Sequence, residues 1–292
     1  MKQFICLEDI REDVFHQLID LAVSLKKKQK KGKFKPLLAH KVLGMIFEKP
    51  SLRTRQSFEV GMTQLGGSAI YISGNEIQMG EREPIKDIAR TLSRYLDLVM
   101  IRAFEHETIT EFAKYATVPV INGLSNYDHP CQAMADLLTI YEHKGTFDNL
   151  RVAYIGDGNN VARSLGRACK LAGCEFVVSC PKGYELSSTS FVHYGDPFKA
   201  VENADVVYTD VWVSMGDEKE EKKRLKVFAD YQVNSELMKA ANPDAIFMHC
   251  LPAVRGQEVT DEVMESSRSV VFDQAENRLH AQKAVLAYLG ER

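Results

Sequence analysis

The sequence lacks two features that would place it in or across a membrane. No apolar run approaches the length of about 18 residues that a spanning helix needs. The first ten residues carry Glu8 and Asp9 where a secretory signal peptide has its apolar centre. We therefore expect a soluble, cytoplasmic protein that has no membrane partner.

Cysteines are few and show no paired spacing. They include no Cys-x-x-Cys motif, and they stand at positions 6, 131, 169, 174, 180 and 250. This pattern predicts reduced, mostly buried thiols rather than a disulfide framework. His249 and Cys250 lack a second ligand pair at zinc spacing, so we expect no metal. A cysteine nucleophile would need a partner base, which the sequence does not locate.

A large excess of one charge is also absent. Lysine and arginine number 37, aspartate and glutamate 40, and the net charge is −3. This balance removes the usual electrostatic reason to expect nucleic acid as a partner. The segment from Lys26 to Lys35 holds seven lysines, which we interpret as a solvated helix end and a linker. A nucleic-acid patch is the alternative, and it would require salt-sensitive binding.

The chain does contain a regular alternation of two patterns. Its 292 residues, 45% apolar and 26% charged, are typical of a globular protein long enough for two domains. After a helical pattern over 12–27, short β-rich runs alternate with segments of helical periodicity. The runs lie at 42–47, 69–72, 97–101, 118–121, 151–155, 175–179, 205–209 and 245–249, with 269–272 as a possible further strand. Because such runs indicate parallel sheets covered on both faces, we predict an α/β fold with two doubly wound parallel-sheet domains.

The strands fall into two groups of similar size. We predict a first domain over 1–140 and a second over 141–275, with a connecting helix over 132–150. The C-terminal helix, 276–292, is expected to pack back on the first domain. Ligands of open parallel sheets collect beyond the carboxyl ends of the strands, so we expect the active site in the cleft between the domains.

The first strand is followed by Ser51-Leu-Arg-Thr-Arg55, which opens a helix. Ser51 is a suitable N-cap, and the backbone amides of the first turn carry partial positive charge. Arg53 adds a bidentate donor, so the segment suits a phosphate group. A capped helix with ordinary surface arginines explains the same residues equally well.

Two further groups follow later strands of the first half. Arg102 follows the run at 97–101, and His129 stands near the start of the helix after 118–121. The helix dipole disfavours an imidazolium there, which would leave a neutral N–H donor near an anion site. A histidine that merely packs at a helix start is an equal alternative.

The second half repeats this scheme with different chemistry. Its strands are followed by Gly156-Asp-Gly-Asn-Asn160, by Asp210-Val-Trp-Val-Ser-Met-Gly216 and by His249-Cys-Leu-Pro252. Asp210 and Asn160 suit an amine and a partner that bears an amide or a carboxylate. Cations in one half and these groups in the other predict an enzyme with two substrates.

Together, these residues resemble the ornithine carbamoyltransferases. The motifs are Ser51-x-Arg-Thr-Arg55, His129-Pro-Cys-Gln132, Asp210-x-x-x-Ser-Met-Gly216, His249-Cys-Leu-Pro252 and Ala275-Glu-Asn-Arg278, and the similarity runs from about residue 5 to the C-terminus. The first two are shared with aspartate carbamoyltransferases. The Ser-Met-Gly and His-Cys-Leu-Pro segments are the ones that indicate ornithine.

The resemblance implies three overlapping sets of site residues. The carbamoyl-phosphate set is Ser51, Leu52, Arg53, Thr54, Gln78, Arg102, His129, Gln132, Cys250, Leu251 and Arg278. The catalytic set is Arg102, His129, Thr54, Cys250 and Arg278. The ornithine set is Asn160, Asp210, Ser214 and Met215.

The reaction that the resemblance implies is carbamoyl transfer from carbamoyl phosphate to the side-chain amine of L-ornithine. It yields L-citrulline and phosphate, belongs to arginine metabolism and biosynthesis, and uses neither a metal nor an organic cofactor. The expected assembly is a homotrimer in which Gln78 reaches the site of a neighbouring subunit. The sequence specifies neither the direction of flux, nor assembly beyond a trimer, nor the group that deprotonates the amine.

Two other functions fit parts of the same sequence. Within the family, putrescine is the rival acceptor, although Ser214-Met-Gly216 favours an amino acid. The run Gly156-Asp-Gly-Asn-Asn-Val161 also resembles part of a dinucleotide-binding fingerprint. Val161 replaces its third glycine and the next strand ends without an acidic residue, so an oxidoreductase is disfavoured.

Three departures from the family pattern stand out. Leu52 replaces the usual threonine, which is tolerable if that position supplies only its backbone N–H. Arg163 places a cation near the amine side. The segment 184–196 is shorter than is usual in the family.

Overall fold

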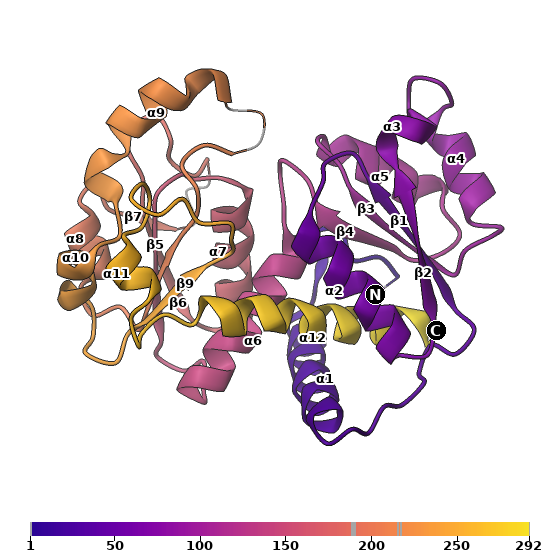
Figure 1. Cartoon of the computed structure of the whole chain (residues 1–292), viewed down its shortest axis with the longest axis horizontal. Coiled ribbons are helices and arrows are strands. Elements are labelled where there is room, and N and C mark those ends of the chain that lie inside the picture. The colour runs from indigo at the N-terminus through magenta and orange to yellow at the C-terminus, as the bar shows by residue number, and fades with distance from the viewer. Residues whose placement is uncertain (1, 188–190, 215, 217, 292) are drawn as a thin grey trace. The chain divides into compact units, whose positions relative to one another are not determined.

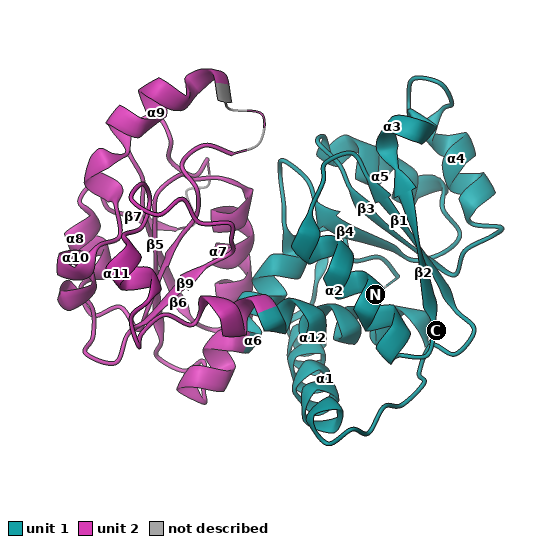
Figure 2. Ribbon diagram, in the orientation of Figure 1, with its two compact units in different colours: residues 1–138, 276–292 teal, residues 139–275 magenta. Residues whose placement is uncertain are grey.

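The structure is a computed structural model that describes residues 2–187, 191–214, 216 and 218–291. It divides into two compact units (Figure 2). Unit 1 comprises 1–138 and 276–292, and unit 2 comprises 139–275. The division falls within two helices, α6 (Pro130–Lys144) and α12 (Val271–Gly290).

Unit 1 contains a four-stranded parallel sheet with the strand order β2-β1-β3-β4 (Figure 1). Its strands are β1 (Val42–Phe47), β2 (Ser68–Ser73), β3 (Leu98–Arg102) and β4 (Val120–Leu124). Its helices are α1 (Glu12–Lys30), α2 (Leu52–Gln64), α3 (Gly74–Ile77), α4 (Ile85–Leu92) and α5 (His106–Tyr115), preceded by a 3-10 turn at Leu7–Asp9. All five residues of β3 are buried, as expected for a central strand covered on both faces.

Unit 2 contains a five-stranded parallel sheet with the order β7-β6-β5-β8-β9. Its strands are β5 (Arg151–Ile155), β6 (Glu175–Ser179), β7 (Val192–His193), β8 (Val206–Thr209) and β9 (Ile246–His249). Its helices are α7 (Asn160–Ala172), α8 (Pro197–Val201), α9 (Glu221–Val227), α10 (Ser235–Ala240) and α11 (Asp261–Met264), with 3-10 turns at Glu218–Glu220 and Ala229–Tyr231. The predicted fold class, two parallel-sheet α/β domains, is confirmed.

Each sheet has its own apolar core and its own topological switch point. Strand order reverses between β1 and β3 in unit 1, and between β5 and β8 in unit 2. Ile46, Val99 and Ile101 belong to the first core, whereas Ala153 and Val207 belong to the second. Open α/β sheets bind ligands beyond the carboxyl ends of the strands at such points. The loops after β1, β3, β5 and β8 are therefore where a site is expected.

Four details of the predicted elements were wrong. The run 269–272 is not a strand, because only Ser269 pairs with Phe247 and α12 begins at Val271. The fifth strand of unit 2 is instead the two-residue β7. The connecting helix expected over 132–150 runs from 130 to 144. The last helix begins at 271 rather than 276.

The lysine-rich segment is a helix end followed by a linker, as expected, but its first lysine is not solvated. Helix α1 continues to Lys30, because lysine is a good helix former. Lys26 is buried, with its ammonium donating to Asn277 Oδ1 (2.7 Å). The other six lysines are exposed: Lys27, Lys28 and Lys30 lie in the last turn of α1, and Lys31, Lys33 and Lys35 follow it.

The cysteines and the helix lengths bear on disulfide bonds and on membrane insertion. All six cysteines lie among the described residues and are free; five are buried and Cys250 is half-buried. None of the helices that the structure describes is long and apolar enough to cross a membrane.

Candidate active site

The turn after β1 presents the positive end of a helix. Ser51 is the N-cap of α2, and its hydroxyl accepts a hydrogen bond from the Thr54 backbone N–H (3.3 Å). This bond satisfies one of the amides that the helix itself leaves without a partner. The Leu52 side chain is 73% exposed, so the cap makes no use of it. A threonine at that position is therefore not needed for this turn.

A buried guanidinium connects this turn to two other helices of unit 1. Arg278 of α12 donates to Thr54 Oγ1 (3.1 Å) and to Gln132 Oε1 of α6 (2.6 Å). Gln132 in turn donates to Asp136 Oδ1 (2.8 Å). Thr54, Gln132 and Arg278 are each at most 3% exposed. These bonds fix the orientation of the guanidinium, and the Thr54 hydroxyl, which accepts from Arg278, keeps its own proton to donate.

His129 stands immediately before α6 and is almost completely buried. Burial, followed by the positive charges of Arg278, Arg102 and Arg53, holds the pKa of His129 well below its usual range. The imidazole is consequently neutral at physiological pH and can donate one N–H hydrogen bond without carrying a charge. Three guanidinium groups, from three separate parts of the sequence, therefore act on one side chain.

Positive charge is thus concentrated at the switch point of unit 1. Arg102 is the last residue of β3 and is 5% exposed, and Arg53 lies in the first turn of α2. The backbone N–H of Glu48, just after β1, donates to the Arg102 carbonyl (2.9 Å), which ties the two strand ends together. Such an arrangement can hold a phosphate and stabilise an oxygen on which negative charge develops.

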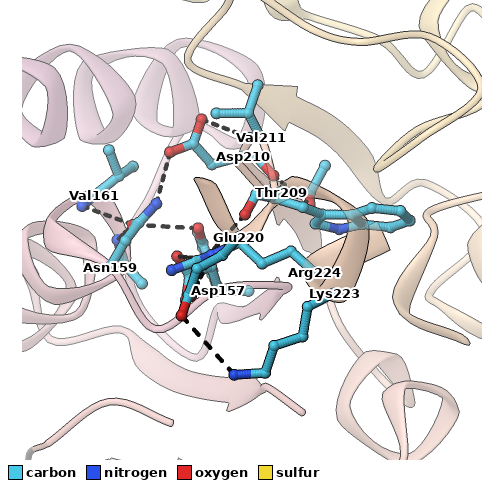
Figure 3. A network of polar contacts seen from close by, with 12 residues as sticks. Asp157, Asn159, Val161, Thr209, Asp210, Val211, Glu220, Lys223 and Arg224 are labelled. Atoms are coloured by element: carbon cyan, nitrogen blue, oxygen red, sulfur yellow. Dashed lines mark hydrogen bonds and ion pairs between the residues drawn. The ribbon is translucent and has the colours of Figure 1, made fainter. Parts of the chain in front are cut away.

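At the switch point of unit 2, donors from the loops after β5, β8 and β9 hold a carboxylate, and Figure 3 shows the bonds from Asn159 and Val211. Asp210 follows β8, and its Oδ2 accepts from Asn159 Nδ2 (2.9 Å). Its Oδ1 accepts from the Val211 backbone N–H (2.8 Å) and from Cys250 Sγ (2.9 Å). Asp210 is 6% exposed, so its position is set by these donors. A fixed carboxylate of this kind suits a substrate ammonium group.

The residue that holds Asp210 is Asn159, whereas the sequence motifs indicated only its neighbour Asn160. Asn159 is the N-cap of α7: its Oδ1 accepts from the backbone N–H groups of Val161 (2.9 Å) and Ala162 (3.1 Å). Its amide nitrogen remains available for Asp210. An asparagine between a strand-ending glycine loop and an apolar-periodic segment is a helix-start signal, and it could have identified this residue.

An ion pair beside Asp210 was also missed. Arg224 of α9 donates to Asp157 Oδ2 (2.9 Å) and to the Trp212 carbonyl (3.0 Å), and both charged residues are 8% exposed (Figure 3). The pair links the loop after β5 with the loop after β8. No local pattern in the sequence signals it, because the partners lie 67 residues apart.

Asp210, His249 and Cys250 offer ligand atoms that lie within 4.8 Å of one another. Both nitrogens of His249 are engaged, however. Nδ1 accepts from the Leu251 backbone N–H (2.9 Å), and Nε2 pairs with Glu258 Oε1 (3.2 Å). Both imidazole nitrogens are therefore engaged outside this trio, and within it Cys250 and Asp210 are hydrogen-bonded to each other.

The other residues named from the sequence lie as follows. Asn160 is the first residue of α7, and Ser214 lies half-buried in the loop after β8. Met215 lies outside the described residues. Gln78 is the C-cap of α3 and is exposed. Arg163 donates to the Ser187 hydroxyl (3.3 Å).

Comparisons with known proteins give one consistent result. The family model described as aspartate/ornithine carbamoyltransferase, carbamoyl-P binding domain, matches residues 2–142, and the Asp/Orn binding domain of the same family matches 148–289. A curated ornithine carbamoyltransferase of Archaeoglobus fulgidus is 53% identical over 299 residues, which cover 99% of this chain and 97% of that protein. The anabolic ornithine carbamoyltransferase of Pyrococcus furiosus is 52% identical, covering 98% and 95%. The solved structure of an ornithine carbamoyltransferase from Pyrococcus furiosus superposes with a TM-score of 0.95 over 98% of this chain and 96% of that one.

Proposed function

Because the chain belongs to the aspartate/ornithine carbamoyltransferase family, we propose that it is an ornithine carbamoyltransferase. It transfers the carbamoyl group of carbamoyl phosphate to the side-chain amine of L-ornithine, giving L-citrulline and phosphate. One structural observation carries this proposal. Arg53, Arg102 and Arg278 surround a neutral, buried His129 beside the capped start of α2.

Carbamoyl phosphate binds, in this proposal, to the residues named for it in unit 1. The turn from Ser51 to Thr54, with Arg53 and Arg102, holds the phosphate group through backbone N–H groups and guanidinium donors. His129, Gln132, Arg278 and the Thr54 hydroxyl surround the carbamoyl group. Their mutual hydrogen bonds support these roles, because donors that are already fixed need no reorganisation when charge develops. Cys250 and Leu251 remain the proposed substrate contacts contributed by the loop after β9.

Ornithine binds, in this proposal, to Asn160, Asp210, Ser214 and Met215. Support comes from the Asp210 carboxylate, which three donors hold in place at the switch point of unit 2. A carboxylate in a partly desolvated site binds an ammonium group strongly. The acceptor thus carries a charged amino group in addition to the amine that reacts.

The chemistry requires a neutral amine. A lysine-like amine has a reference pKa of about 10.4, so ornithine must lose a proton before it attacks. Attack forms the new C–N bond and places negative charge on the carbamoyl oxygen, which Arg102, His129 and Thr54 stabilise as donors. The C–O bond to phosphate then breaks, and the phosphate leaves with the bonding electron pair into the positive field of the arginines. The attacking nitrogen gives up its second proton to the departing phosphate, which leaves the neutral ureido group of citrulline. Positioning of the two reactants supplies much of the remaining acceleration.

The assembly in this proposal is a homotrimer in which Gln78 completes the site of a neighbouring subunit. Two features of unit 1 support it. Gln78 is exposed. The edge strand β2 also leaves Ile70 and Tyr71 exposed by 51% and 40%, and an unpartnered apolar edge favours association.

We also propose that the enzyme acts in the cytoplasm and in the direction of arginine biosynthesis. Six cysteines that form no disulfide among the described residues support the first point. The Pyrococcus furiosus relative, which is named anabolic, supports the second.

An acceptor comparison tests the proposed function. Purified protein with saturating carbamoyl phosphate is assayed with ornithine, putrescine and aspartate, and kcat/KM is measured for each. We expect ornithine to exceed both rivals by at least about 100-fold, because a site with fixed charged partners rejects analogues that leave them unpaired. A preference for putrescine would indicate a diamine carbamoyltransferase instead. No transfer to any of the three amines would refute it.

A further inference from the structure

The loop after β9 contains an unfavourable backbone conformation. Leu251 has φ +58°, in the left-handed region where a side chain crowds the backbone. It directly follows Cys250, whose thiol donates to Asp210 Oδ1 (2.9 Å). Such a conformation persists only when surrounding contacts enforce it. The contacts that do so here involve His249.

The hydrogen bonds of His249 define its protonation. The Leu251 backbone N–H, which can only donate, points at Nδ1 (2.9 Å), so Nδ1 carries no proton. The proton of the neutral ring is therefore on Nε2, which donates to Glu258 Oε1 (3.2 Å). Both side chains are completely buried. His249 is thus a fixed acceptor for the strained residue two positions later.

Glu258 also holds the same turn at Val254. Its Oε1 also accepts from the Val254 backbone N–H (2.5 Å), so one carboxyl oxygen is bonded both to His249 and to the far end of the turn. The Glu258 carbonyl is itself held by the Val233 backbone N–H (2.8 Å). The start of the turn is fixed by Gln274, whose Oε1 accepts from the His249 backbone N–H (2.9 Å).

We propose that His249 is a positioning residue for carbamoyl transfer: by accepting the Leu251 N–H, and with Glu258 orienting its ring, it holds Cys250 and Leu251 in the conformation that the substrates meet. The inference rests on the proposed function, which names these two residues as substrate contacts. His249 is not a general base, because Nδ1 is already an acceptor and the ring is inaccessible.

Two substitutions of His249 test the roles of its two ring nitrogens separately. In His249→Asn, the Oδ1 atom occupies the place of Nδ1 and can still accept from Leu251, but the bond to Glu258 is lost. In His249→Gln, an amide N–H still reaches Glu258, but the acceptor for Leu251 is lost. We expect His249→Asn to retain kcat within about tenfold. We expect His249→Gln to lose about 100-fold in kcat with little change in the KM for carbamoyl phosphate, as for a small displacement of reacting groups.

A second readout does not depend on activity. Cys250 is the only cysteine that is not buried, so iodoacetamide should modify it first. Its rate of modification, followed by mass spectrometry, should stay near the wild-type rate in His249→Asn and rise severalfold in His249→Gln, where the turn is released. His193→Gln is the matched control, since His193 also ends a strand of unit 2 but is exposed. It should change neither rate.

The outcomes are distinct. Equal losses in His249→Asn and His249→Gln, or wild-type behaviour in both, would overturn the proposal. If His249→Gln does not fold, Glu258→Gln is compared with Glu258→Leu. Glu258→Gln keeps an oxygen that accepts from both His249 and Val254, whereas Glu258→Leu does not. Only Glu258→Leu should then show the lower kcat and the faster modification of Cys250. If the wild-type protein makes no citrulline, the proposed function fails, whereas the alkylation rates still test the turn.

Discussion

At the scale of single residues, His129 shows how neighbouring charge decides what a side chain can do. An exposed histidine is partly cationic near neutral pH, but burial and three guanidinium groups hold the pKa of His129 well below that range. The ring therefore donates a hydrogen bond without repelling the arginines beside it. This combination, a neutral donor within a cationic cluster, suits a carbamoyl oxygen next to a phosphate.

Removal of a charge should have a different effect in each unit, because the proposal assigns a different substrate to each. We expect Arg102→Ala to lower kcat/KM for carbamoyl phosphate by about 10²- to 10³-fold, because a preorganised donor is lost. We expect Asp210→Asn to raise mainly the KM for ornithine. Steady-state kinetics with each substrate varied in turn measures both effects. Arg90→Ala, which removes an exposed guanidinium stacked over Tyr115 in unit 1, is the control.

The assignment would be contradicted if Arg102→Ala behaved like Arg90→Ala. It would also be contradicted if both site variants affected the two substrates equally, since the residues would then not be divided between the substrates.

The buried Lys283 should make the free energy of unfolding depend on pH. It is 3% exposed and donates to Gln64 Oε1 (2.8 Å) and to Gln29, and burial lowers its pKa to about 8. In the unfolded chain, the Lys283 ammonium keeps its proton up to about pH 10.4. Between pH 8 and 10.4 the unfolded state therefore binds more protons than the folded state. The free energy of unfolding consequently rises with pH over this range. Between pH 8 and 10.4, the wild type should gain up to about 3 kcal/mol relative to Lys283→Met.

Urea unfolding of the two proteins at several pH values tests this, because all other titrations cancel in the difference. Below pH 8 the difference should be constant, since Lys283 is then charged in both states. A difference that stays flat up to pH 10.4 would show that the buried ammonium keeps its ordinary pKa.

At the scale of elements, the start of α7 combines a structural and a functional role in Asn159. Asn159→Ser keeps a cap for the helix but loses the amide donor to Asp210. We expect the free energy of unfolding of this variant to change by less than about 0.5 kcal/mol. Its kcat/KM for ornithine should fall about 10- to 100-fold, because one hydrogen bond to a charged group is lost. Thermal unfolding and kinetics measure the two effects.

The control for Asn159 is Asn234, the N-cap of α10, which accepts from the Leu237 backbone N–H (2.9 Å). Asn234→Ala should lose about 1 kcal/mol of stability and leave the kinetics unchanged. If Asn159→Ser were as active as the wild type, the orientation of Asp210 would not depend on Asn159.

The elements also show which parts of the fold the sequence can predict. The central strand β3 was predicted because its unalternated apolar run is typical of a strand buried on both faces. The run 269–272 looks the same locally but enters α12, since a short apolar run does not distinguish a strand from a buried helix start. The two-residue β7 is exposed and leaves no comparable pattern.

For the site, the sequence predicts the residues but not their contacts. Ser51 and Arg53 were recognisable from the helix start that follows β1, as was Asp210 from the end of β8. The bond between Arg278 and Thr54 joins positions 224 residues apart, and no local pattern encodes such a pairing. Glu258 was missed for the same reason, because its role depends on how the loop after β9 folds back.

At the scale of the whole molecule, the proposed trimer predicts complementation between inactive variants. Gln78→Ala and Arg102→Ala are each expected to be nearly inactive, because each removes one part of the same site. When the two are unfolded, mixed and refolded together, some subunits should combine an intact Arg102 with an intact Gln78 from a neighbour. Activity should then return to a sizeable fraction of the wild-type level.

The controls are the same two variants refolded separately. Analytical ultracentrifugation of the wild type should show a species three times the 32.9 kDa mass of the chain. A monomer that is fully active, or a mixture without recovered activity, would exclude a shared Gln78.

The most direct test of the central claim is to follow the carbamoyl carbon itself. Purified protein is incubated with ¹³C-labelled carbamoyl phosphate and L-ornithine, and the label is observed by NMR. The account predicts that the label appears in the ureido group of citrulline, with one phosphate released per citrulline, and that Arg102→Ala slows this transfer. Release of phosphate without labelled citrulline, at the rate seen without protein, would contradict it.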